Sequence, residues 1–306
     1  MRSLAAAAMK SPRAATIYAA LFALLAAVFA PFLLLSGAIA ALATLRHGTA
    51  AGLKVLLPAA VLSSAVKLGM AVNLGPAMTL PIYWAAVWGG AIVLRRTADQ
   101  GAVLCVVAAA VAGYAVAMRL LHPDVVAYWR ERLEALTALV KSEGGMSLTG
   151  DQLTIVASVM HESTLVMFTA LLAATLLTGR AWQAALYNPG GFRQEFHALK
   201  LPRQLSPIAA IVALAAMLRM AEGSYAGIAN DGVLLLVLLF AFQGLAVTHA
   251  RASARGWRRA WLAALYALLV LMPLLVGTVL ALLGIADMLA DFRRLGPPRG
   301  RRPGHH

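Results

Sequence analysis

Residues 101–121 decide the fold class, because they read GAVLCVVAAAVAGYAVAMRLL and contain a single charged side chain, Arg119. A helix needs roughly 20 predominantly apolar residues to cross the hydrocarbon core of a bilayer. This stretch has that length and that composition. It is therefore typical of one transmembrane helix.

Similar hydrophobic blocks lie on both sides of this stretch, at about 15–45, 50–72, 77–95, 153–178, 205–221, 232–250 and 259–290. Over all 306 residues, 61% are hydrophobic, 12% are charged and the mean hydropathy is +0.80. Soluble domains have about 45–50% apolar and about 25% charged residues. We therefore predict an all-α, polytopic transmembrane helix bundle, with eight blocks giving about eight to ten crossings in one membrane domain, 1–292.

The net charge of +14 has its explanation in the position of the basic residues. They lie between the hydrophobic blocks, where lysine and arginine hold loops on the cytoplasmic side of a membrane. A nucleic-acid-binding protein needs a basic face with stacking aromatics, and the sequence does not suggest one. We expect a bacterial inner-membrane protein in the lipid bilayer, with no nucleic-acid partner.

The first and last blocks are too long for one upright helix, and each contains a central proline, Pro31 or Pro273. A proline inside a helix removes a backbone hydrogen bond and kinks or breaks the helix. If each block forms two short helices, both termini and every basic cluster face the cytoplasm, which gives about ten crossings. Eight crossings stay open, because half-length helices need a thinned bilayer or a re-entrant arrangement.

Two connections are predicted to contain amphipathic helices of their own. Residues 124–143 have apolar side chains at helical spacing with charges between them, which predicts a helix on the outer membrane face. Residues 180–203 read as two short amphipathic pieces along the cytoplasmic interface, separated by a polar turn. We expect this second connection to dock a partner protein. The candidate docking residues are Trp182, Tyr187, Asn188, Pro189, Gly190, Gly191, Phe192, Glu195 and Phe196.

Four polar residues inside the apolar blocks are candidates for an intramembrane site: Lys67, His161, Glu162 and Gln243. An ionisable group in a membrane is costly and therefore suggests function. Some have a plainer explanation, since Lys67 can snorkel to the interface and His161 can make a structural hydrogen bond, whereas Gln243 needs a partner inside the membrane. The HExxH zinc motif fails because Leu165 replaces its second histidine. We predict no metal site, no cofactor and no catalytic residues.

Polar residues at the ends of the blocks have simpler interpretations. Arg219 and Glu222 are three residues apart on one helix and are expected to pair. Asn230 and Asp231 are expected to cap the helix that follows them. The arginine-rich tail, 293–306, is expected to be disordered and to attract anionic lipid.

Three stretches carry a resemblance to a known family. They are Trp182–His197, which includes NPGGF, the segment FQGLA at 242–246, and LGIAD at 283–287 continuing to Asp291-Phe292-Arg293. They resemble the YybS-like family of uncharacterised bacterial membrane proteins. That family is distantly similar in fold to the substrate-binding components of energy-coupling-factor transporters and to MreD. The resemblance marks Gly284, Asp287, Asp291 and Arg293 as a C-terminal motif, but it implies no established activity.

Two functions remain open from the sequence. The first is a small-molecule binding or transport component, with a polar cavity formed by some of the four intramembrane residues and with 180–203 contacting an energising partner. The second is a scaffold for cell-envelope or division proteins, without a ligand of its own. A membrane enzyme has the weakest support, because no catalytic motif is present.

Overall fold

The computed structural model describes residues 2–69, 78–142, 144–145, 148–222 and 227–290. Within these ranges the chain forms thirteen α-helices and no strand, which confirms the predicted all-α class. The helices are α1 (Arg2–Ala8), α2 (Pro12–Leu25), α3 (Phe32–His47), α4 (Thr49–Gly69), α5 (Thr79–Thr97), α6 (Gln100–Leu121), α7 (Val125–Ser142), α8 (Gly150–Tyr187), α9 (Gly191–Ala198), α10 (Leu205–Ala221), α11 (Ile228–Ala254), α12 (Arg259–Leu271) and α13 (Pro273–Ala290).

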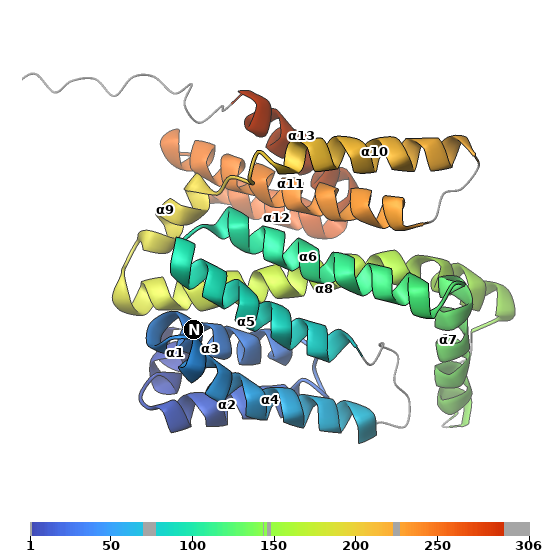
Figure 1. The fold of residues 1–306 in the computed structure, drawn as a ribbon, viewed down its shortest axis with the longest axis horizontal. Helices are drawn as coiled ribbons and strands as arrows, with labels where there is room; N and C mark the ends of the chain where they lie inside the picture. The colour runs from blue at the N-terminus through green and yellow to red at the C-terminus, as the bar shows by residue number, and fades with distance from the viewer. Residues whose placement is uncertain (1, 70–77, 143, 146–147, 223–226, 291–306) are drawn as a thin grey trace, which may run out of the picture.

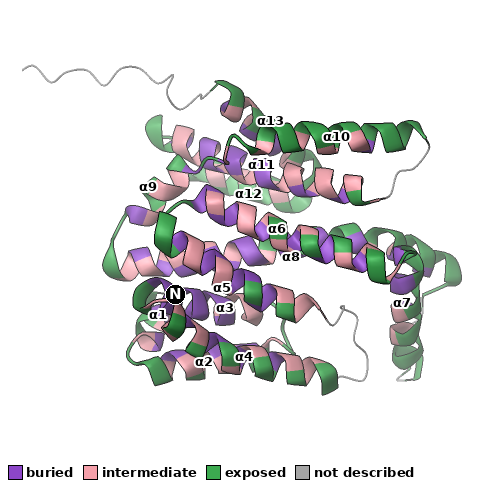
Figure 2. Ribbon diagram, viewed as in Figure 1, coloured by how far each residue is buried: buried purple, intermediate pink, exposed green. Residues whose placement is uncertain are grey.

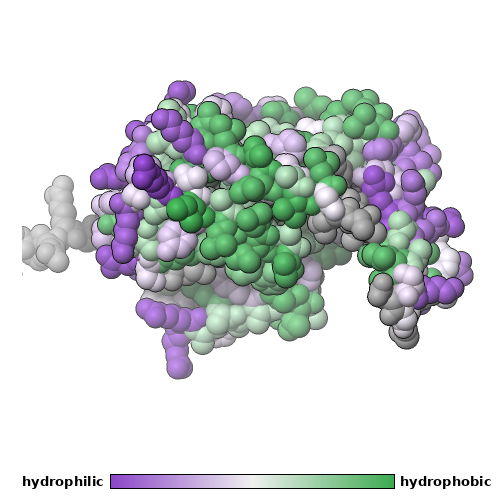
Figure 3. All heavy atoms as spheres, turned by 90° about the horizontal axis from the view of Figure 1, so that it is seen from below, coloured by the Kyte–Doolittle hydropathy of each residue, from purple (hydrophilic) through white to green (hydrophobic). Residues whose placement is uncertain are grey.

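Most of the helices lie side by side along the long axis of the molecule, while α7 stands across one end (Figure 1). We call this the α7 end and the opposite one the α9 end. Figure 3 shows hydrophilic residues gathered at the two ends and a hydrophobic zone between them. This distribution is the one that a bilayer requires of a protein that spans it.

Five helices are long and apolar enough to cross a membrane: α4, α6, α8, α11 and α13. Four shorter apolar helices, α2, α3, α10 and α12, accompany them. Together they form the predicted polytopic helical bundle.

The first long block is broken in the region of Pro31, where α2 has ended and α3 begins. The hydroxyl of Ser36 donates to the carbonyl oxygen of Ala19 at 2.6 Å. The rings of Phe22 and Phe32 stack with centroids 5.7 Å apart. Because the later residue of α3 meets the earlier residue of α2, the two helices are antiparallel, as the helix-pair interpretation predicts.

The last long block is broken at Pro273, where α12 has ended and α13 begins. The two halves differ in how they pack. Helix α13 lies along α11 with Leu280 and Ala281 buried, whereas α12 contains no buried residue. In Figure 2, α3, α6 and α8 show many buried residues, while α10 is exposed along much of its length. Helices α10 and α12 thus lie on the outside of the bundle.

Basic clusters from separate connections meet at the α9 end. Arg95 at the end of α5 donates to the carbonyl oxygens of Thr44 and Leu45 at the end of α3, at 3.1 and 2.9 Å. Arg46 lies over the ring of Tyr187 at the end of α8, 4.3 Å from its centroid. A cation near the carboxyl end of a helix is favourable, because unpaired carbonyl groups are exposed there. The ends of α3, α5 and α8, which carry basic residues expected on one side of the membrane, thus meet at one end of the bundle.

The two amphipathic connections agree with their predictions to different degrees. Helix α7 confirms the helix expected at 124–143, and it packs against α8 with Tyr128 and Trp129 buried. In the second connection, 180–187 is not a separate amphipathic piece, because these residues continue α8 to Tyr187. A helix of 38 residues is about 57 Å long, so α8 extends beyond a bilayer core of about 30 Å.

Candidate functional site

Gln243, one of the four intramembrane candidates, joins three elements of the bundle. Its side-chain oxygen accepts from the backbone N–H of Leu201 at 2.9 Å. Its amide nitrogen donates to the carbonyl oxygen of Gly284 at 3.1 Å and to the carboxylate of Asp287 at 3.0 Å. Gln243 is fully buried, and a buried amide needs such partners. The residue thus fastens the connection after α9 to α11 and α13.

Glycines permit the close crossing of α11 and α13 beside Gln243. A Cβ at Gly244 would collide with the carbonyl oxygen of Leu280, and a Cβ at Gly284 would collide with that of Phe240. Small residues at a crossing let the backbones of two helices approach closely. The FQGLA and LGIAD strings, which carry part of the family resemblance, therefore pack directly against each other.

His161, the second candidate, belongs to a largely buried polar group that we call the ion cluster, formed by Arg119, His161 and Asp231. The Arg119 guanidinium donates twice to the Asp231 carboxylate, at 2.5 and 2.7 Å. Nε2 of His161 lies 3.3 Å from the same carboxylate, and its Nδ1 has no hydrogen-bond partner in the described part of the chain. The cluster joins α6, α8 and α11.

The ion cluster corrects the interpretation of Asp231 as a helix cap. Helix α11 begins at Ile228 with Gly227 as its N-cap residue, so Asp231 lies inside the first turn. Arg219 and Glu222 do form the expected pair, at 3.8 Å and exposed to solvent. Asp231 is buried and Glu222 is exposed, although the two acids look similar in the sequence.

The four intramembrane candidates do not gather in one place. Asp231, the partner of His161, is twelve residues from Gln243 on the same helix, which is about 18 Å along its axis. Glu162 is exposed next to His161. Lys67 is half-buried near the end of α4, which packs on α2, α3 and α5. The structure does not assemble the shared polar cavity that the sequence suggested.

The expected docking segment begins with an exposed turn at the α9 end. Tyr187, Asn188, Pro189 and Gly190 are exposed, and Gly190 has φ +89°, a left-handed conformation that favours glycine. The turn directs the chain from α8 into α9.

Other residues of this segment are held internally. Trp182 is buried at 5% exposure. The Glu195 carboxylate accepts two hydrogen bonds from the Arg180 guanidinium, one of them at 2.7 Å. Gly191 is buried against the side chain of Asn188. These residues fix α9 to α8, so only part of the expected docking surface is open to a partner.

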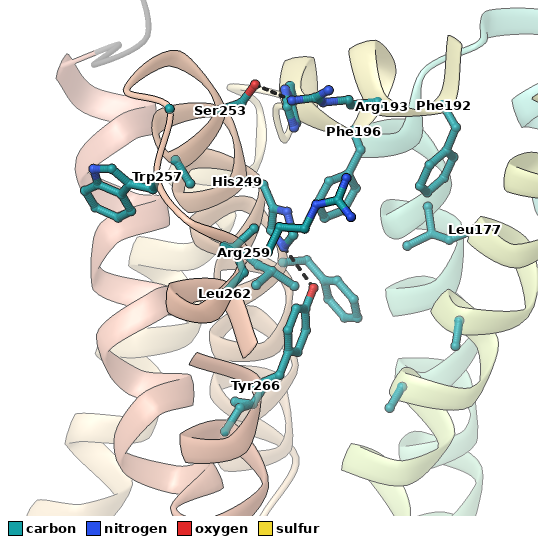
Figure 4. A pocket seen from close by; sticks show the side chains of 18 residues that line it. Leu177, Phe192, Arg193, Phe196, His249, Ser253, Trp257, Arg259, Leu262 and Tyr266 are labelled. Atoms are coloured by element: carbon teal, nitrogen blue, oxygen red, sulfur yellow. Dashed lines mark hydrogen bonds between the residues drawn. The ribbon is translucent and has the colours of Figure 1, made fainter. Parts of the chain in front are cut away.

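Phe192 and Phe196 take part in a different feature, a groove of about 850 Å³ bounded by α8, α9, α11 and α12. Their rings lie nearly parallel, 6.0 Å apart. Figure 4 shows Leu177 of α8 on one side, α12 with Leu262 and Tyr266 on the other, and α9 at the upper end. Ligand pockets commonly have about 300–1,000 Å³ and mostly apolar walls. The groove has a size and a lining suited to a ligand.

The upper end of the groove is basic. We call Arg193, His197, His249 and Arg259 the groove mouth; all four line the groove, and no aspartate or glutamate is among its described lining residues. Arg193 donates to the hydroxyl of Ser253 at 2.6 Å. Burial, together with the nearby Arg193 and His249, lowers the pKa of His197. The two arginines, with no acid beside them in the groove, give the mouth an excess of positive charge.

His249 marks the boundary between the mouth and the apolar part of the groove. Its Nε2 lies 2.9 Å from the hydroxyl of Tyr266 on α12. The ring of Phe196 contacts it edge-on, with centroids 5.5 Å apart. This contact is one of the few that connect α12 to the rest of the bundle, because α12 packs mainly on α13.

Sequence reasoning missed Arg259, Trp257 and Tyr266 as site residues. They look like an ordinary basic loop followed by an apolar helix. The one signal for this site in the sequence is His249, a polar residue within the hydrophobic block 232–250. Two predicted motif residues, Asp291 and Arg293, and the basic tail lie outside the described residues.

Comparison with known proteins identifies a family. No curated protein and no solved structure matches the chain, so the fold-level likeness to transporter components and MreD stays a prediction. The family described as "Predicted membrane protein (DUF2232)" matches residues 14–288 and fits the resemblance found in the sequence. The chain belongs to this family of membrane proteins of unknown function.

Proposed function

We propose that this protein is a membrane-embedded binding component that holds a small amphipathic molecule in the groove between α8, α11 and α12. The observation that carries the proposal is the groove itself, about 850 Å³ with an apolar interior and a basic mouth. Amphipathic ligands need such a division between apolar walls and a few polar groups at one end. The four separate intramembrane candidates are not required for this binding.

The orientation follows from the basic clusters at the α9 end. We propose that this end faces the cytoplasm of a bacterium and that the protein lies in the inner membrane, because arginine and lysine are retained on the cytoplasmic side. The groove mouth is then at the inner leaflet. Both termini are proposed to be cytoplasmic as well.

Photolabelling of the groove tests the proposed function. Proteoliposomes of phosphatidylcholine would contain a trace of a diazirine-bearing fatty alcohol, and the adducts would be mapped by mass spectrometry. We expect labelling to concentrate on groove residues such as Leu177 and Leu262 and to fall several-fold in Ala174→Trp, which fills the groove. Ala210→Trp, at an exposed position of α10, is the matched control. Equal labelling of the groove and of exposed Ile211 on α10 would contradict the proposal.

A scaffold role remains a second candidate because of the exposed turn from Tyr187 to Gly190. A partner protein at the α9 end would reach this turn without entering the groove. Replacing Pro189 and Gly190 together should then abolish partner capture while the groove labelling of the fatty alcohol is retained. Loss of both would attribute the effect to the position of α9 instead.

A further inference from the structure

We propose that the ligand of the groove is an anionic glycerophospholipid, whose phosphate binds Arg193 and Arg259 and one of whose two acyl chains lies between α8 and α12. This inference rests on the proposed function and names the class of its ligand. Three separate observations support it.

The first observation is unbalanced charge at the mouth. Arg259 is exposed and has no hydrogen-bond or ion-pair partner among the described residues, while Arg193 has a neutral partner, Ser253. Glu195, an acid on α9 itself, is paired with Arg180. An arginine guanidinium matches a phosphate with two parallel hydrogen bonds. The mouth thus offers two such groups to an anion.

The second observation is the apolar space directly below these arginines. Leu177 of α8 faces Leu262 of α12 across the groove (Figure 4). Ala174 of α8 and Leu269 of α12 also line it. A free phosphate ion would leave this space empty of apolar contacts. A lipid fills both parts, with its headgroup at the mouth and a chain below it.

The third observation is the weak attachment of α12. This helix contains no buried residue and packs mainly on α13, so the groove is closed on that side by one loosely packed helix. Val270 and Leu271 near its far end are 80% and 75% exposed. A lipid can therefore enter sideways from the bilayer, without passing through water. Arg193 and Arg259 lie at the α9 end of the molecule, which the proposed orientation puts at the level of the lipid headgroups.

Diazirine-labelled phospholipids test the inference. Trace amounts of photoreactive phosphatidylglycerol or phosphatidylcholine, with identical chains, would be compared in phosphatidylcholine proteoliposomes. A basic residue near an anionic lipid contributes about a fivefold gain in binding. We therefore expect phosphatidylglycerol to label the groove about five- to twenty-fold more than phosphatidylcholine. Arg193→Gln with Arg259→Gln should remove the difference, while Arg258→Gln, a neighbouring residue that does not line the groove, should preserve it.

The other outcomes separate the two proposals. Equal groove labelling by both lipids, with fatty-alcohol labelling intact, would overturn the phospholipid inference and leave the proposed function standing. Absence of groove labelling by every probe would overturn both. A phosphatidylglycerol preference that persists in inorganic phosphate, compared with chloride at matched ionic strength, would support the lipid over the free ion as the ligand of the mouth.

Discussion

Two groups of charged side chains lie at opposite ends of the bundle and differ in how their charge is balanced. In the ion cluster at the α7 end, Arg119 and His161 surround a single carboxylate, Asp231, which is 3% exposed. In the groove mouth at the α9 end, Arg193 and Arg259 have no carboxylate partner among the residues described. The cluster is closed by its own members, while the mouth is open toward a groove. A charged side chain in this bundle therefore suggests binding only where its neighbours leave its charge unbalanced.

The largest effect is expected from opening the ion cluster. Asp231→Asn leaves the Arg119 charge without its counter-charge in a mostly buried place, and losing one partner of a buried pair costs about 3–5 kcal/mol. We expect about 3 kcal/mol, because Arg119 is 19% exposed. Chemical unfolding in detergent measures it. Glu222→Gln, which removes an exposed pair, is the control and should cost below about 1 kcal/mol. Similar losses in both variants would show that the cluster is not a closed structural unit.

A smaller loss of stability is expected from Gln243→Met. Methionine preserves the side-chain volume but leaves the N–H of Leu201 and the carboxylate of Asp287 without this partner. An unsatisfied buried polar group costs about 1–3 kcal/mol, so about 2 kcal/mol is expected in the same unfolding assay. An unchanged midpoint would indicate that water replaces the amide and that Gln243 is not a structural fastener.

A still smaller effect, dependent on pH, is expected at the groove mouth. Because the pKa of His197 is lowered in the folded protein, the unfolded chain binds the proton more readily. The contribution of His197 to stability is therefore complete above its usual pKa of about 6.5 and is lost as pH falls through the lowered value. Thermal unfolding at pH 7.5 and 5.5 should show a smaller decrease in His197→Gln than in the native protein. An equal decrease would assign the pH dependence to other groups.

The smallest effect on stability is expected from Arg259→Gln. This exposed residue has no described partner to lose, and surface substitutions of this kind stay within about 0.5 kcal/mol. The unfolding midpoint should therefore be unchanged, although phospholipid labelling of the groove falls. A loss of more than about 1 kcal/mol in the free energy of unfolding would show that Arg259 has a structural role, as Arg119 has in the ion cluster. It would contradict the proposed difference between the two ends of the bundle.

The fold was predictable from local features of the sequence. Length and hydropathy gave the spans, and Pro31 and Pro273 indicated where the two long blocks break. The helix at 125–142 followed from its apolar spacing. Residues 180–187 were wrongly separated from α8, because Arg180 looked like the end of a span. A helix that continues beyond the bilayer has no sequence signal that a hydropathy limit can detect.

The candidate site was much less predictable. His249 and Tyr266 are seventeen residues apart and meet because α12 reverses the chain after Gly256. The partner of Arg119 is 112 residues away. The sequence identifies polar side chains that are costly to bury in a membrane. Whether such a side chain is structural or functional depends on the partners that helix packing brings to it. The sequence suggested one shared site for Gln243 and His161, whereas the structure places them in two separate hydrogen-bond networks.

The shortness of α12 has a consequence for the surrounding lipids. Its 13 residues extend about 20 Å, less than a hydrocarbon core of about 30 Å, and α2 with 14 residues is similar. Lipids next to a short hydrophobic helix compress their chains, or the helix and its neighbours tilt, at a cost that grows with each ångström of mismatch. The hydrophobic part of the molecule is therefore thinner than a typical bilayer core at two places, beside α2 and beside α12. We expect the protein to be most stable in short-chain bilayers and to collect in thinner regions of a membrane.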